Sequence, residues 1–230
     1  MLALVTALVC LAGVLAAGAV LVNELVRPPT ADELRAASKA EVAGRWRIWE
    51  AGKVFPERLS YTSETGGEET ARRVGIAPGH TCSAAVRPAA VRALRTGGCR
   101  AGLRATYLDQ PQGVVVTVAL LAFADPKVAR QVADALGSSN VPRFSLRALP
   151  VPRTAAAKFT DAARQKQTVD SYGPYVVLST AGYADGRPRE AVTQLRDEPF
   201  AVGGQLAADI AAELARTLTP NCAQERVWDC

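Results

Sequence analysis

The chain contains a single histidine, His80, which is followed by Thr81, Cys82 and Ser83. An imidazole beside a thiol and hydroxyls can do nucleophilic chemistry when a base lies within hydrogen-bond reach and a third group orients it. Adjacent residues seldom reach that geometry, and the sequence has neither a G-x-S-x-G nor an S-x-x-K motif. We therefore interpret His80 as a surface-loop residue and predict no catalytic residues.

The cysteines carry a stronger signal than the histidine. Outside the apolar N-terminus there are four of them, Cys82, Cys99, Cys222 and Cys230. An even count without metal-site spacing favours disulfides in an oxidising compartment. We expect Cys82–Cys99 and Cys222–Cys230, with Cys10 free, because a short helix and a glycine pair separate the first two and a proline precedes the last two. A bridge between the two regions is the rival pairing.

No motif predicts a metal or a cofactor. Zinc sites use closely spaced cysteine and histidine clusters, which the sequence lacks. The glycine pairs form neither a P-loop nor a dinucleotide-binding fingerprint. Asp109, Asp125 and Asp185 follow predicted strands, and we interpret them as turn and cap residues. A hydrolase site made from two of them would require a proximity that the sequence alone does not establish.

Composition is that of a globular protein, with 49% apolar and 21% charged residues among 230. The net charge is +5, and 22 of the 27 basic residues are arginine, an excess that we attribute to a GC-rich gene. This charge could attract anionic lipid head groups or wall polymers. We expect no nucleic-acid partner, because the arginines are scattered along the sequence and aromatic residues make up only 6%.

Residues 2–22 carry no charge and are almost all Ala, Leu, Val and Gly. As a helix, such a run would be roughly 30 Å long, which matches the hydrocarbon core of a bilayer. We therefore predict a transmembrane anchor in residues 1–26, retained in the cell membrane. One alternative is a signal peptide cleaved near Ala17-Gly18-Ala19, which would leave a secreted protein. The other is a buried core helix.

Two features of the sequence predict opposite orientations for this anchor. Arg27, Arg35 and Lys39 follow the apolar run, and basic residues normally flank its cytoplasmic end. The four cysteines favour the opposite orientation, since disulfides persist outside the cytoplasm. We expect the domain that follows the anchor to be extracytoplasmic.

The segment 27–75 is predicted to be a juxtamembrane helix and connector. Thr30 and Glu33 form a capping box that predicts a helix from about Ala31 to Ala43. Trp46 and Trp49 are expected to pack in a core. Residues 63–69 form a polar loop, which we interpret as a solvated turn.

Residues 76–230 are predicted to form one α+β domain. The pattern predicts a short helix from Pro88, and strands over 100–109, 114–123, 143–149, 167–172 and 175–183. Further helices are expected over 126–136 and 155–164, and before Pro220. Two central strands end alike, in Phe-Ala-Asp and Tyr-Ala-Asp, so two β-β-α units are a further interpretation. Such units would form an antiparallel sheet with helices on one face.

Two segments resemble actinobacterial membrane-anchored exported proteins of unknown function. They are the stretch Trp46–Gly52 with Phe55-Pro56, and the strand Arg104–Asp109 with its valine-rich partner. The resemblance covers residues 40–135, and it implies export and carries over no active site. Our leading hypothesis is a non-enzymatic, membrane-anchored domain that binds a protein or an envelope component. An envelope hydrolase without a recognisable motif and an accessory subunit of a membrane complex are the alternatives.

Overall fold

Two units make up the chain in the computed structural model, which describes residues 2–138, 144–192, 197–221 and 228. The first unit comprises Met1–Ser38 with Thr219–Cys230, and the second comprises Lys39–Leu218. Helix α1 (Leu2–Val26) lies in the first unit. A search of the described residues found no helix with both the length and the apolar character needed to cross a membrane.

Helix α2 (Ala31–Ile48) begins at the predicted capping box. The backbone N–H of Thr30 donates to Glu33 Oε2 at 2.7 Å, and that of Glu33 donates to Thr30 Oγ1 at 3.3 Å. Hydrogen bonds from Arg27 and Thr30 lower the pKa of Glu33 to about 2. The helix runs beyond the predicted end at Ala43, because its last turns belong to the second unit and pack against the core of that unit. There Trp46 and Trp49 lie against the core, as predicted.

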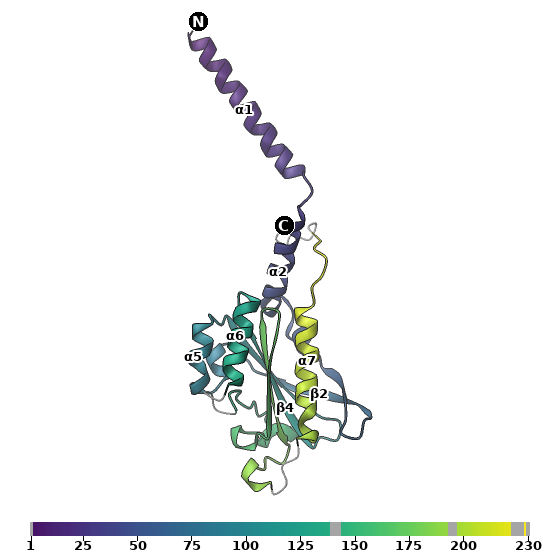
Figure 1. Ribbon diagram of the computed structural model, residues 1–230. Coiled ribbons are helices and arrows are strands. Elements are labelled where there is room, and N and C mark those ends of the chain that lie inside the picture. Colours follow the sequence, from purple (N-terminus) through teal and green to yellow (C-terminus); the bar gives the residue numbers. More distant parts are fainter. Residues whose placement is uncertain (1, 139–143, 193–196, 222–227, 229–230) are drawn as a thin grey trace. The chain divides into compact units, whose positions relative to one another are not determined.

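The second unit is built on a six-stranded antiparallel sheet with strand order β1-β2-β3-β4-β6-β5 (Figure 1). The strands are β1 (Arg58–Thr62), β2 (Glu68–Ile76), β3 (Ala101–Leu108), β4 (Val114–Ala122), β5 (Lys166–Tyr172) and β6 (Tyr175–Tyr183). The α-helices after α2 are α3 (Ala51–Val54), α4 (Cys82–Ala85), α5 (Pro88–Thr96), α6 (Pro126–Gly137) and α7 (Ala201–Ala215). The α+β class and the antiparallel sheet are as predicted.

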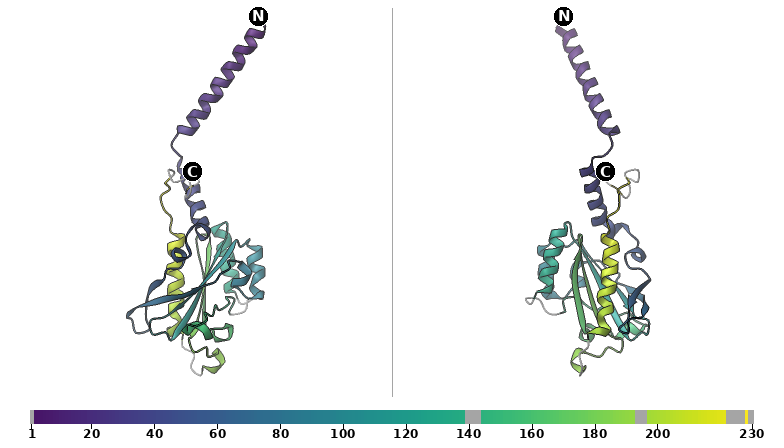
Figure 2. Two further views of the ribbon diagram at one scale, coloured as in Figure 1. Left: turned by 180° about the vertical axis from the view of Figure 1, so that it is seen from behind. Right: turned by 45° about the vertical axis from the view of Figure 1, so that its right-hand side comes forward.

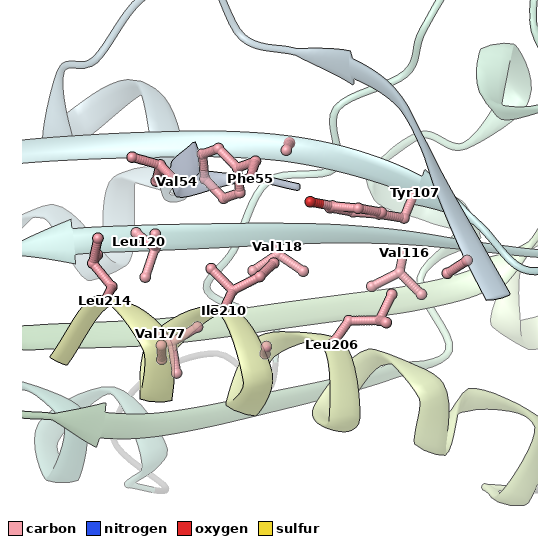
Figure 3. Packing of buried hydrophobic residues seen from close by; sticks show 14 of the residues in the cluster. Val54, Phe55, Tyr107, Val116, Val118, Leu120, Val177, Leu206, Ile210 and Leu214 are labelled. Atoms are coloured by element: carbon pink, nitrogen blue, oxygen red, sulfur yellow. The ribbon is translucent and has the colours of Figure 1, made fainter. Parts of the chain in front are cut away.

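Helices cover both faces of the sheet, whereas the sequence analysis expected one. Helix α7 packs on one face, and α5 and α6 pack on the other (Figures 1 and 2). Figure 3 shows Leu206 and Ile210 of α7 against Val116 and Val118 of β4. The physical reason lies in β4, all nine of whose residues are buried. A continuous apolar run is typical of a strand that is covered on both sides.

The two β-β-α units exist in the chain order β3-β4-α6 and β5-β6-α7. They are not equivalent in space, because Phe123 packs with α6 on one face whereas Tyr183 packs on the α7 face. Successive residues of a strand point to opposite faces, so a shift of one residue exchanges the faces. The similar strand ends therefore precede helices on opposite sides of the sheet.

Several predicted boundaries differ from the structure. Strands β1 and β2 belong to the sheet, so the second unit begins at Lys39 and not near residue 76. In place of the strand 143–149, the described part forms a single bridge between Val86 and Leu146. The expected helix 155–164 is two 3-10 turns, Ala155–Lys158 and Asp161–Ala163. These turns cross β6 so closely that a Cβ on Gly182 would lie 2.2 Å from the Ala163 carbonyl oxygen.

Helix α2 is attached to α7 by the side chain of Arg45, which also forms a buried ion pair with Glu41 of α2. Glu41 and Arg45 are one turn apart, and their side chains are 4% and 1% exposed, respectively. Arg45 donates two hydrogen bonds from Nε and Nη2 to the Glu41 carboxylate, and its Nη1 donates to the carbonyls of Leu214 at 2.9 Å and Arg216 at 2.7 Å. The guanidinium thus satisfies carbonyl groups at the end of α7, where a helix carries partial negative charge.

Candidate functional site: an arginine-lined groove

A disulfide closes the segment that carries α4 and α5. Cys82 and Cys99 are bonded, with a Cα–Cα distance of 6.3 Å, which confirms the predicted pairing. Cys10 is a free, exposed thiol, as expected. Cys222 and Cys230 lie outside the described residues, so their pairing stays a prediction.

The closed segment lies directly on β3. The backbone N–H of Gly102 donates to the His80 carbonyl at 2.8 Å, and a Cβ on Gly102 would lie 3.0 Å from the Cα of Cys82. Glycine at this position therefore permits the close approach of α4 to the strand. Leu94 of α5 is buried in the same cluster as Phe123 and Leu146, so α5 has a fixed place on the sheet.

The second wall of the site comes from a segment distant in the sequence. Residues 85–87 pair with 145–147 through two backbone bonds, from Arg87 N to the Ser145 carbonyl at 2.8 Å and from Arg147 N to the Ala85 carbonyl at 3.0 Å. The Gln167 side chain on β5 accepts from Leu146 N at 2.8 Å and supports this segment. The pairing brings Arg147 to the side of α5.

Between these walls lies a groove of about 610 Å³. Its lining residues are Ser83, Val86, Pro88, Val91, Arg92, Arg95, Thr96 and Arg147. We call it the arginine groove. Its three arginines are exposed, none of them forms an ion pair with a described residue, and no acidic residue lines it.

The positive charge around the groove also affects two neighbouring arginines, Arg104 and Arg164. Burial, followed by repulsion from Arg147, lowers the pKa of Arg104. Burial also lowers the pKa of Arg164, with repulsion from Arg87 and Arg147 opposing the attraction of Asp161. Asp161 is already engaged, since its Oδ1 accepts from Ala148 N at 2.8 Å and lies 3.6 Å from Arg164 Nη1. The charge balance around the groove therefore favours an anion.

The arginine groove was missed by the sequence analysis, which considered the arginines scattered. A signal was present, because seven arginines and no acidic residue lie between Glu69 and Asp109. Arg92 and Arg95 belong to this run. Arg147 does not, and only the pairing of residues 85–87 with 145–147 brings it to them.

The residues considered first for chemistry have separate roles in the structure. The exposed His80 is 6.3 Å from Trp46, measured between ring centroids, and its ring has no hydrogen-bond partner among the described residues. Asp125 caps α6 through a 2.7 Å bond from Lys127 N. Asp185 accepts from Arg187 N at 3.0 Å in the turn after β6 and forms an ion pair with the Arg187 side chain.

Asp109 accepts from Val114 N in the β3–β4 turn at 2.9 Å. All three aspartates therefore have the turn and cap roles predicted for them. Within the part of the chain that the structure describes, no three acidic, histidine or cysteine side chains are grouped so as to hold a metal ion.

Comparison of the chain with protein-family models, curated proteins and solved structures found no match. The similarity to actinobacterial exported proteins accordingly stays an expectation from the sequence. The functional argument depends on the geometry of the arginine groove.

Proposed function

We propose that this protein is a membrane-anchored, extracytoplasmic binding domain that takes an anionic component of the cell envelope into the arginine groove. One observation carries the proposal: three exposed arginines, none of which forms an ion pair with a described residue, line a groove that has no acidic residue among its described lining. Guanidinium groups match carboxylate and phosphate oxygens in paired hydrogen bonds. The Ser83 and Thr96 hydroxyls add donors beside them.

The location in this proposal is supported by two features. The Cys82–Cys99 disulfide is typical of an oxidising, extracytoplasmic compartment. The anchor in the proposal rests on the sequence of residues 2–22, which carry no charge and are almost all Ala, Leu, Val and Gly. An anchor of this kind would hold the domain close to envelope polymers and lipid head groups.

The proposal is tested by calorimetric titration with tripolyphosphate, a short anion. We expect the triple variant Arg92→Gln/Arg95→Gln/Arg147→Gln to lose at least about tenfold in affinity, which corresponds to about 1.4 kcal/mol of binding free energy. The control Arg35→Gln/Arg130→Gln/Arg216→Gln removes the same charge from other exposed positions. Equal losses in both variants would show that net charge, and not the groove, attracts the anion.

A further inference from the structure

Two further arginines lie on β1 and β2, at one edge of the sheet. Arg58 of β1 and Arg72 of β2 are direct cross-strand partners, and Ser60 and Thr70 form the next pair on that face. They border a groove of about 530 Å³. Its lining residues are Arg58, Leu59, Ser60, Thr70, Arg72, Leu108, Asp109, Gln110 and Gln112. We call it the strand groove.

The charge of this pair is not compensated within the described residues. Arg58 and Arg72 are exposed, and neither forms an ion pair there. Like charges directly opposite each other on neighbouring strands destabilise a sheet. The one acidic lining residue, Asp109, is occupied by the bond from Val114 N, and burial raises its pKa. A bound anion would relieve the repulsion between the two guanidinium groups.

The strand groove and the arginine groove belong to the same face of the sheet. Arg72 pairs with Leu108 of β3, and Arg104 lies four residues before Leu108, so all three point to one side. Arg104 Nη1 donates to the Arg147 carbonyl at 3.3 Å, which connects this row to the arginine groove. Four residues of strand correspond to roughly 13 Å.

A chain segment lies over this face between the two grooves. The Thr106 hydroxyl donates to the Leu149 carbonyl at 2.7 Å, and Val151 lies against Gly75 of β2. The segment continues to Arg153, which is exposed and adds a further positive charge to it. The face therefore has basic residues at both ends and in the connecting segment.

We propose, on the basis of the function proposed above, that the ligand is a linear polyanion that occupies both grooves at once. Along β3, Leu108 of the strand groove lies roughly 13 Å from Arg104, which contacts the Arg147 backbone, and a single small anion does not cover that distance. No aromatic residue lines either groove, so neither offers the stacking surface that single-stranded nucleic acids use. The structure accordingly favours a polymer of repeated phosphate or carboxylate groups without bases.

The test compares long-chain polyphosphate with tripolyphosphate on the full chain. Because the second contact is made by a ligand that is already bound, we expect the long chain to bind more than about tenfold tighter per phosphate. Arg58→Gln/Arg72→Gln should abolish that advantage and leave tripolyphosphate affinity in the arginine groove within about twofold of wild type. The matched control Arg35→Gln/Arg216→Gln should keep the advantage. Thermal unfolding of each variant verifies that it is folded.

Each outcome has a defined meaning. An undiminished long-chain advantage in Arg58→Gln/Arg72→Gln overturns the two-groove proposal while leaving the arginine groove in place. Tripolyphosphate binding that does not depend on Arg92, Arg95 and Arg147 overturns the proposed function itself. A long-chain advantage with polyglutamate as well as polyphosphate supports recognition of oxyanions in general. Tighter binding of single-stranded DNA than of polyphosphate of equal charge overturns the choice of a polymer without bases.

Discussion

Arg45 shows how much of the stability of the second unit depends on a single side chain. Replacing it with methionine would leave the carboxylate of Glu41 buried without its partner, and three carbonyl groups at the end of α7 would lose a donor. Breaking a buried pair in this way costs about 3–5 kcal/mol. We expect Arg45→Met to lower the free energy of unfolding by that amount in urea denaturation followed by tryptophan fluorescence.

Two further variants separate this effect from charge alone. Arg216→Met removes an exposed partner of Glu213 and should change the free energy of unfolding by less than about 1 kcal/mol. In Arg45→Met/Glu41→Leu both charges are absent, so much of the lost stability should return. If Arg45→Met were no less stable than Arg216→Met, the buried pair would have no role in holding α2 against α7.

At the scale of elements, the Cys82–Cys99 disulfide is the covalent closure of the arginine groove. In the chain-entropy model, a loop of this length stabilises the folded state by about 3 kcal/mol. We therefore expect Cys82→Ser/Cys99→Ser to lose about that much in urea denaturation, and to bind tripolyphosphate more weakly because α5 is less well fixed. Cys10→Ser is the matched control and should change neither quantity. Unchanged stability after loss of the disulfide would contradict the prediction.

The sequence predicted elements well where the signal was local. Thr30 and Glu33 are three residues apart and their hydrogen bonds are reciprocal, so the capping box could be recognised directly. The Cys82–Cys99 pairing followed in the same way from the short helix and the glycines between the two residues.

Contacts between residues far apart in the sequence could not be predicted from it. The position of Arg147 beside α5 depends on a bridge between residues 86 and 146, and no local pattern encodes that contact. The strands in 58–76 were missed as part of the domain, because β1 is short and follows a proline. The unbroken apolar run of β4 already indicated that helices cover both faces of the sheet. The interpretation as two repeated β-β-α units instead led to the prediction of helices on one face.

At the scale of the whole molecule, the proposed extracytoplasmic location is the property that most needs a measurement. We expect an alkaline phosphatase fused after Cys230 to be active, and a fluorescent protein that matures only in the cytoplasm to stay dark, because structural disulfides are typical of oxidising compartments. The basic residues after the apolar run favour the reverse result. Fluorescence without phosphatase activity would establish the cytoplasmic orientation.

The attachment of α2 to α7 also has a consequence for the order in which the protein is completed. Chains emerge from the ribosome N-terminus first, so Arg45 is made long before the carbonyl groups of Glu213, Leu214 and Arg216 that it binds. The Tyr175 hydroxyl, which donates to the Val42 carbonyl, also comes late. Helix α2 therefore cannot make these contacts until α7 has been synthesised. A nascent chain halted before α7 lacks the partners of Arg45. Synthesis of α7 and the residue after it is thus the step that supplies the last partners of Arg45.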